Sequence, residues 1–210
     1  KEMQDLIGKH IGNFIITESL GKGGQGQVFL AQHRENEGLK VAIKMLLPGA
    51  QPDDIDLLFR EAKEMASLNH PHIVRITDFS TDKDPFHPYM VMEYIVGGSL
   101  ATLLEDATEL NPEQIANIAL RLCDALNEAH KKGIVHRDIK PQNILMDGLN
   151  PKLADWGIAK VPGLGTIVGT GNFRGTYIYA SPEQVTGKSD LDGRSDIYSL
   201  GIVLYELLSG

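Results

Sequence analysis

The sequence predicts an α+β protein made of two parts, a strand-rich part over residues 1–95 and a mainly helical part over residues 96–210. Three observations predict this division. Short segments rich in β-branched and aromatic residues alternate with Gly or polar turns in the first part. Apolar residues recur at helical spacing in the second part. The turn-like stretch VGGSL lies where the pattern changes.

Five segments of the first part have the pattern of strands, namely residues 13–21, 27–33, 40–46, 72–80 and 88–95. One helix interrupts them over residues 53–69. Acidic residues open this helix, and its apolar residues recur at helical spacing: Ile55, Leu58, Phe59, Ala62, Met65 and Leu68.

The second part contains two predicted helices. The first begins after the N-cap Asn111, with Pro112 at its first position, and ends before Gly133. Cys123 lies in an apolar stretch of this helix, so we expect a buried small residue rather than a reactive thiol. The last helix, over residues 195–210, is apolar on nearly every side, which requires surrounding protein.

Composition narrows the possible functions. The chain has 210 residues, of which 42% are hydrophobic and 23% are charged, as in ordinary globular proteins. Its net charge of −8 argues against a general nucleic-acid binder, which needs a basic face. The sequence shows neither a membrane-spanning apolar run nor a signal-peptide core. We expect a cytoplasmic segment without membrane contact, and an anchor elsewhere in a longer protein stays open.

Two weak signals of phosphate binding occur in the first part. Gly21, Gly23 and Gly26 lie between two strand-like segments, where glycines let backbone N–H groups approach phosphate oxygens. An ordinary hairpin turn explains the same pattern. Lys44 lies in the apolar strand VAIK, and Glu61 lies on the helix that follows. A lysine held by a carboxylate is suited to gripping two phosphates of a nucleotide.

The stretch HRDIKPQN, residues 136–143, is the strong signal. Asp138 can accept a proton from an attacking hydroxyl or orient it, and Lys140 can neutralise charge on the transferring group. Asn143 and Asp155 offer the oxygen ligands that Mg²⁺ prefers. The combination predicts transfer of a phosphoryl group, because catalysis of that reaction is positioning plus charge neutralisation.

These motifs, in this order, resemble those of a eukaryotic-type (Hanks-type) serine/threonine protein kinase domain in its bacterial form, over residues 14–210. The DFG-like triplet is Asp155-Trp156-Gly157, the APE-like triplet is Ser181-Pro182-Glu183, and Asp196 matches a buried aspartate of the family. The resemblance implies a protein-kinase-like fold with an N-lobe of one antiparallel sheet and one helix, and a helical C-lobe. It also implies transfer of the γ-phosphoryl group of ATP, with Mg²⁺, to Ser or Thr hydroxyls of a protein substrate.

Residue roles are carried over from the same resemblance. The catalytic residues would be Asp138, Lys140, Lys44, Glu61 and Thr176, and the magnesium ligands would be Asn143 and Asp155. Met92 would lie at the rear of the adenine pocket, with the backbone of Glu93 and Ile95 on the adenine edge and Ser99 near the ribose. The complete set of expected ATP contacts is Leu20, Gly21, Gly23, Gly26, Val28, Ala42, Lys44, Met92, Glu93, Ile95, Ser99 and Leu145.

The resemblance further implies regulation. Arg137 beside Asp138 could pair with a phosphate on the segment that follows Asp155, with Thr170 as the first candidate and Thr166 as the second. Trp156 stands where the family usually has phenylalanine. We expect it to pack with the three residues Met65, Ile76 and His136, and its indole N–H needs a partner.

The family's helical lobe continues past the point where this chain stops, so we expect a C-terminally incomplete domain that is weakly active or inactive when made alone. Two other functions stay open. A nucleotide-binding scaffold without catalysis would explain the fold but not the presence of Lys44, Asp138, Asn143 and Asp155 together. A small-molecule kinase would not need RGTYIYASPEQ, which resembles a peptide-docking segment.

Overall fold

The computed structural model describes residues 6–22, 26–46, 52–80, 88–106, 108–156, 177–188 and 190–209. The chain divides into two compact units. The first comprises Lys1–Ser67 and Arg75–Tyr94, and the second comprises Leu68–Val74 and Ile95–Gly210. Each unit is described by itself.

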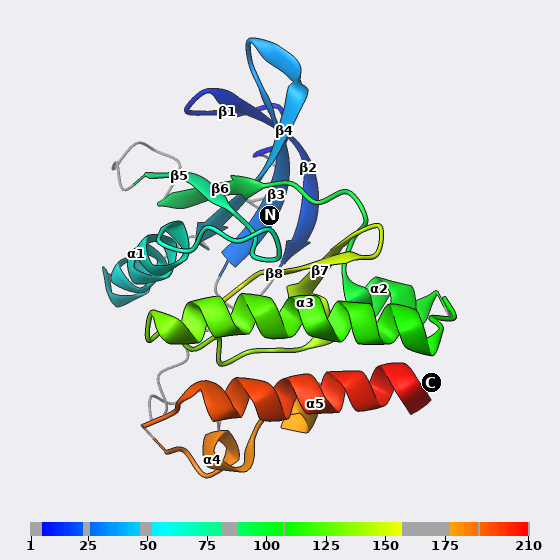
Figure 1. The fold of residues 1–210 in the computed structure, drawn as a ribbon. Coiled ribbons are helices and arrows are strands. Elements are labelled where there is room, and N and C mark those ends of the chain that lie inside the picture. Colours follow the sequence, from blue (N-terminus) through cyan, green and yellow to red (C-terminus); the bar gives the residue numbers. More distant parts are fainter. Residues whose placement is uncertain are drawn as a thin grey trace. The chain divides into compact units, whose positions relative to one another are not determined.

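The first unit contains a six-stranded sheet in the order β1-β2-β3-β4-β6-β5, with every neighbouring pair antiparallel (Figure 1). Its strands are β1 (His10–Ile11), β2 (Phe14–Lys22), β3 (Gly26–His33), β4 (Asn36–Leu46), β5 (Ile76–Ser80) and β6 (Tyr89–Glu93). Three of the five predicted strands match β2, β3 and β6 to within two residues at each end, and β4 begins four residues before the predicted strand. The antiparallel sheet expected for the first part is thus confirmed.

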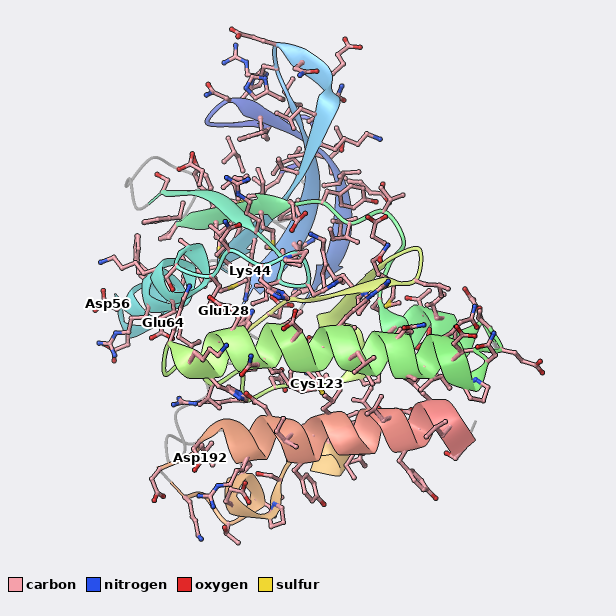
Figure 2. All side chains as sticks on the ribbon, in the orientation of Figure 1. Lys44, Asp56, Glu64, Cys123, Glu128 and Asp192 are labelled. Atoms are coloured by element: carbon pink, nitrogen blue, oxygen red, sulfur yellow. The ribbon has the colours of Figure 1, made fainter. Side chains whose placement is uncertain are left out.

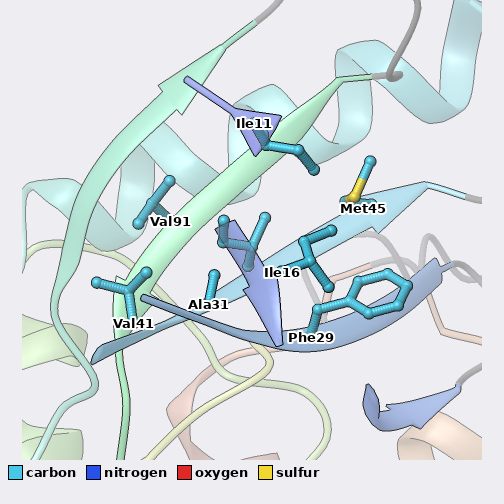
Figure 3. Close-up of a cluster of buried hydrophobic side chains, with 8 residues drawn as sticks. Ile11, Ile16, Phe29, Ala31, Val41, Met45 and Val91 are labelled. Carbon is cyan, nitrogen blue, oxygen red and sulfur yellow. The ribbon is translucent and has the colours of Figure 1, made fainter. Parts of the chain in front are cut away.

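One face of this sheet carries the core of the first unit (Figure 3). Side chains alternate between the two faces of a strand, and directly paired residues of neighbouring strands share a face. The register pairs Phe29 with Ile43 and Ile43 with Val91, so these side chains meet on one face. The full cluster is Ile11, Ile16, Phe29, Ala31, Val41, Ile43, Met45 and Val91.

Helix α1 (Pro52–Ala66) is the helix predicted in the first part. Leu58, Ala62 and Met65 are buried at intervals of four and three residues, which is the apolar stripe that the sequence shows. The helix ends at Ala66, and Leu68 belongs to the second unit.

The second unit contains the helices α2 (Leu100–Glu105), α3 (Pro112–Lys131), α4 (Pro182–Val185) and α5 (Gly193–Ser209). It also contains the hairpin β7 (Ile144–Asp147) and β8 (Asn150–Leu153), and the short 3₁₀ turns η2 (Pro141–Asn143) and η4 (Tyr177–Tyr179). Helices α3 and α5 lie side by side (Figure 1). Asn111 is the N-cap of α3 and Gly133 follows the end of the helix, as predicted. The structure adds a capping box between Asn111 and Gln114 and a φ of 75° at Gly133.

The strand predicted over residues 72–80 is wrong in its first part. Residues up to Val74 lie with the second unit, where the N–H of Val74 donates to the carbonyl of Leu153 at 2.9 Å. The N–H of Leu153 donates in turn to the carbonyl of His72 at 2.9 Å. The segment therefore satisfies its backbone along β8 instead of extending β5.

Cys123 is exposed, which corrects the prediction of a buried residue (Figure 2). The buried face of α3 consists of Ile115, Ile118, Leu122, Ala125, Leu126 and Ala129. Cys123 follows Leu122 by one residue, a rotation of about 100° around the helix axis, and so it leaves that face.

Helix α5 is buried on one side only. Leu200 and Val203 are buried, whereas Tyr205 and Leu208 are 71% and 65% exposed. The sequence predicts a helix that needs surrounding protein on nearly every side, and within the described residues it has such cover on one side only. In the part of the chain that the structure describes, no helix has the length and apolar character needed to cross a membrane.

Candidate active site

The sheet of the first unit places several expected nucleotide contacts on one face. The register pairs Val28 with Lys44, and it pairs Ala42 with Met92. Lys44 and Ala42 are two residues apart on β4, so all four side chains lie on the same face of the sheet. That face is opposite the one that carries Phe29 and its cluster, since Phe29 follows Val28 directly.

The glycine pattern around β2 and β3 has a partly structural cause. Gly21 pairs with Val28 in the register, and a Cβ there would meet open space. A Cβ on Gly26, in contrast, would overlap the backbone carbonyl oxygen of Met45. Gly26 is therefore required for the close approach of β3 and β4, whatever else binds there. Leu20 is 41% exposed, and Gly23 lies outside the described residues.

Lys44 is buried on β4, with only 8% of its surface exposed (Figure 2). A buried ammonium is costly unless it has a charged or hydrogen-bonding partner. Glu61, the expected partner, lies on α1, and its side chain is outside what the structure describes. The pairing of Lys44 with Glu61 stays a prediction.

The expected adenine and ribose contacts divide between the units. In the first unit, the N–H of Glu93 donates to the carbonyl of Arg75 at 2.9 Å, which fixes the end of β6. In the second unit, Ile95 is buried and Ser99 caps α2 by accepting from the N–H of Thr102. Ser99 also forms an isolated antiparallel bridge with Leu145. Ser99 and Leu145 are thus brought together.

Asp138, Lys140 and Asn143 form one hydrogen-bonded cluster in the second unit. The ammonium of Lys140 lies 2.9 Å from Oδ2 of Asp138, and both side chains are largely buried. Nδ2 of Asn143 donates to the same Oδ2 at 2.9 Å and to the backbone carbonyl of Asp138 at 2.8 Å. The Asp138 carboxylate therefore has a fixed position and a neighbouring positive charge.

The β7–β8 hairpin brings Asn143 and Asp155 to the same end. Asn143 immediately precedes β7, and its carbonyl accepts from the N–H of Ala154 at 2.9 Å. Asp155 follows Ala154 with a φ of 52°, a left-handed backbone that is uncommon for a residue with a side chain. Within the described residues, no group of three or more His, Cys, Asp or Glu side chains could hold a metal ion.

The donor set at this end of the hairpin nevertheless suits Mg²⁺. Both hydrogen bonds from the Asn143 side chain use its amide nitrogen, so its oxygen Oδ1 makes no hydrogen bond within the described residues. An amide oxygen and a carboxylate are hard ligands, and Mg²⁺ takes one or two of these together with phosphate oxygens. The two residues could therefore share a magnesium ion that is also bound to a nucleotide.

Asp196 binds the backbone of the two residues that immediately precede Asp138. Its carboxylate is 1% exposed and accepts from the N–H of His136 and from the N–H of Arg137, each at 2.8 Å. The ring of His130 lies 2.8 Å from the same carboxylate. Arg137 has a φ of 66°, a conformation that costs a non-glycine residue on the order of 1–2 kcal/mol. The buried carboxylate offsets that cost.

The rings of His136 and Trp156 are in contact, with centroids 4.6 Å apart and planes tilted by 38°, which confirms one of the three contacts expected for Trp156. Met65 and Ile76, the other two, belong to the first unit. Trp156 is 1% exposed, and its Nε1 has no hydrogen-bond partner in the described part of the chain. Among the described residues, the indole therefore fills space without a partner for its N–H.

His136 should make the stability of the protein depend on pH. Burial lowers its pKa below the ordinary 6.5, although Asp196 and Asp138 oppose the shift. Burial lowers the pKa of His72 in the same direction. As the pH falls, the histidines of the unfolded chain therefore take up protons at a higher pH than those of the folded protein. The free energy of unfolding is thus highest above about pH 6.5 and decreases below it.

Urea unfolding at about pH 7.5 and pH 5.5 checks this expectation, with NMR of the histidine ring signals to identify the group. The lowered pKa values of Glu183 and Asp192 act in the same direction only below about pH 4.5, outside this window. Equal stability at the two pH values, or a His136 ring that titrates in the native state near 6.5, would contradict the expectation.

The segment after residue 176 is attached to the rest of the second unit by side-chain hydrogen bonds. The hydroxyl of Tyr179 donates to Glu206 at 2.7 Å. Burial is the larger cause and this hydrogen bond the second cause of a raised pKa of Tyr179. Ser195 Oγ donates to Glu183 at 2.6 Å. Nε2 of Gln184 donates to the carbonyl of Arg137 at 2.8 Å.

Sequence reasoning missed several of these residues. Gln184 follows Ser181, which the sequence analysis names in the APE-like triplet, at the spacing of a capping box, and this signal could have identified it. His130, Ser195 and Glu206 have no local signal, because their partners lie 66, 12 and 27 residues away. Thr166, Thr170 and Thr176, which the sequence singles out, lie outside the described residues.

Comparison with known proteins agrees with this geometry. The model of the family "Protein kinase domain" matches residues 14–210. The chain is 42% identical over 209 residues to the serine/threonine-protein kinase PrkC of Bacillus subtilis (strain 168), covering 98% of this chain and 32% of PrkC. It is 42% identical over 206 residues to the serine/threonine-protein kinase PknB of Mycobacterium leprae (strain TN), covering 93% of this chain and 32% of PknB.

A solved structure gives the same result. The crystal structure of the PknI kinase domain of M. tuberculosis is similar with a TM-score of 0.73 and 29% identity, covering 96% of this chain and 74% of that one. The chain spans about a third of the length of the curated relatives that it matches. The family model covers nearly the whole chain, and the chain therefore belongs to the protein kinase domain family.

Proposed function

We propose that the protein is an ATP-dependent serine/threonine protein kinase, which transfers the γ-phosphoryl group of ATP to hydroxyl groups of a protein substrate. The observation that carries this proposal is the cluster of Asp138, Lys140 and Asn143, with Asp155 at the same end of the β7–β8 hairpin. The relatives named serine/threonine-protein kinase support the choice of substrate class. A cytoplasmic location, where ATP and Mg²⁺ are available, is part of the proposal.

Each residue of the cluster has a distinct role in the proposed reaction. Asp138 orients the attacking hydroxyl and accepts its proton, while Lys140, held 2.9 Å from Asp138, neutralises charge on the transferring group. Asn143 and Asp155 would hold Mg²⁺, which neutralises phosphate charge when bound. Thr176 would help to hold Asp138 and Lys140, as the family resemblance implies.

In the first unit we assign nucleotide contacts to the sheet face that carries Val28, Ala42, Lys44 and Met92. Lys44 would grip phosphate oxygens, with Glu61 as its partner. The glycines of the β2–β3 turn would present backbone N–H groups. The remaining proposed contacts are Leu20, Glu93, Ile95, Ser99 and Leu145.

Regulation by phosphorylation is the finer part of the proposal. Nε of Arg137 is buried and has no hydrogen-bond partner within the described residues. A buried guanidinium N–H without a partner is costly, and a phosphate on Thr170 or Thr166 would supply one.

Transfer of label from γ-labelled ATP tests the proposal, with the intact protein, a generic protein substrate and a panel of small hydroxyl compounds. We expect label on protein serine or threonine, and its loss with the Asp138→Asn variant. Nucleotide binding without any transfer would favour a scaffold, and label on small molecules alone would favour a small-molecule kinase. Either result contradicts the proposal.

A further inference from the structure

Arg137 is held on both sides of its left-handed backbone. Its N–H donates to Asp196 on α5, as described above. Its carbonyl accepts a hydrogen bond of 2.8 Å from Nε2 of Gln184 on α4. The chain elements that make these two bonds lie more than forty residues further along the sequence, so neither bond is a consequence of local turn geometry.

The Gln184 side chain uses both ends of its amide. Its oxygen Oε1 accepts from the N–H of Ser181 at 2.9 Å, while Oγ of Ser181 accepts from the N–H of Gln184 at 3.4 Å. These two bonds are the capping box of α4. Because the N–H of Ser181 requires an acceptor, the amide oxygen faces Ser181 and the amide nitrogen faces Arg137.

We propose that Gln184 is a positioning residue for Asp138, and that it acts through the peptide bond between Arg137 and Asp138. The carbonyl of Arg137 and the N–H of Asp138 belong to one rigid planar unit. Fixing that carbonyl fixes the orientation of the whole unit, and with it the direction in which the Asp138 side chain leaves the backbone. This inference rests on the proposed kinase function.

The hydrogen bonds on the other side of the unit complete the arrangement. The N–H of Asp138 donates to the ring of His136 at 3.3 Å, a long bond that by itself holds the peptide unit weakly. The carboxylate of Asp138 is held separately by Lys140 and Asn143. Gln184 therefore couples the docking of the 177–188 segment to the geometry of the residue that would meet the substrate hydroxyl.

A purely structural role is the alternative, since Gln184 also caps a helix. The variant Gln184→Glu separates the two roles. A glutamate at this position of a capping box keeps the acceptor for the N–H of Ser181 and is itself a favoured residue there. It replaces the donor with a carboxylate oxygen that faces the carbonyl oxygen of Arg137, so the bond to Arg137 is lost and repulsion between two oxygens takes its place, while the capping bond remains.

The chain offers a matched control in the capping box of α3. Gln114 accepts from the N–H of Asn111 at 2.9 Å, as Gln184 does from Ser181, and within the described residues its side chain makes no bond to the Arg137–Asp138 region. We expect Gln184→Glu to lower kcat for protein phosphorylation about tenfold, since small misplacements at a reaction centre have effects of this size. We expect KM for ATP to stay unchanged and the thermal midpoint to fall by only about 2–4 °C, and we expect Gln114→Glu to change neither kcat nor KM.

Backbone hydrogen exchange gives a readout that does not depend on activity. In Gln184→Glu, the N–H groups of Arg137 and Asp138 should exchange at least several-fold faster, while Gln114→Glu should leave them unchanged. If Gln184→Glu does not fold, Gln184→Met removes both bonds and Ser181→Ala removes only one capping bond. The positioning role then predicts slow transfer in the first and normal transfer in the second.

The outcomes separate the two proposals. Unchanged kcat and unchanged exchange in Gln184→Glu overturn the positioning role, as does an equal loss in Gln114→Glu. If the unsubstituted protein transfers no phosphate, the proposed function fails, and the exchange comparison alone decides whether Gln184 holds the Asp138 peptide.

Discussion

The variant Asp138→Asn should transfer phosphate about 10²- to 10⁴-fold more slowly than the unsubstituted protein, the range attributed to a positioned acid or base. An asparagine has nearly the same shape, and its amide oxygen can still accept from Lys140 and Asn143 in place of Oδ2 of Asp138. It cannot accept a proton from the attacking hydroxyl. The loss should therefore be in kcat, with little change in stability.

Single-turnover transfer with saturating ATP and a protein substrate measures this effect, together with the thermal midpoint. Asp147→Asn is the matched control, because Asp147 is an exposed carboxylate in the same hairpin that Asn143 precedes. It should leave transfer unchanged. A transfer rate for Asp138→Asn within a factor of two of the unsubstituted rate would contradict the assigned role.

The variant Asp196→Ala should have the largest effect on stability. It removes the acceptor of two backbone N–H groups and the partner of the His130 ring, all in a buried setting. Each buried donor left unpaired costs about 1–3 kcal/mol, so we expect a loss of about 3–5 kcal/mol in the free energy of unfolding. Arg137 would also lose one of the bonds that hold its left-handed backbone.

Urea unfolding of the variant and of Asp192→Ala measures the difference. The Asp192 carboxylate is exposed, pairs with the Arg194 side chain and accepts from the backbone N–H of Arg194 at 2.9 Å at the start of α5, so its removal should cost less than removal of the buried Asp196. Phosphate transfer by Asp196→Ala should also be lost in the folded fraction. The anchoring role of Asp196 would be contradicted if Asp196→Ala lowered the free energy of unfolding by 1 kcal/mol or less, with an unfolding midpoint close to that of Asp192→Ala.

Local signals in the sequence predicted much of the fold. The apolar, β-branched segments that form β2, β3 and β4 and the residues that begin and end α3 are local properties, and the structure agrees with both. The motif around Asp138 predicted the cluster with Lys140 and Asn143, because the three residues are neighbours in sequence. Features that depend on residues close together in sequence could therefore be predicted.

Contacts between residues far apart in sequence could not be predicted in this way. The hairpin of β7 and β8 consists of two four-residue strands, too short for a clear period. The backbone of His72 and Val74 follows β8 rather than β5 because of bonds that no local pattern encodes. The contact of Gln184 with Arg137 spans 47 residues and depends on how α4 is placed.

The central claim is that Asn143 and Asp155 face one magnesium ion bound to ATP. Manganese substitutes for magnesium at oxygen ligands and broadens the NMR signals of nearby nuclei, so ATP with Mn²⁺ and ATP with Mg²⁺ can be compared directly. We predict that the signals of Asn143 and Asp155 broaden together, at the same Mn²⁺ concentration and only when ATP is present. Broadening of one residue without the other would contradict the claim.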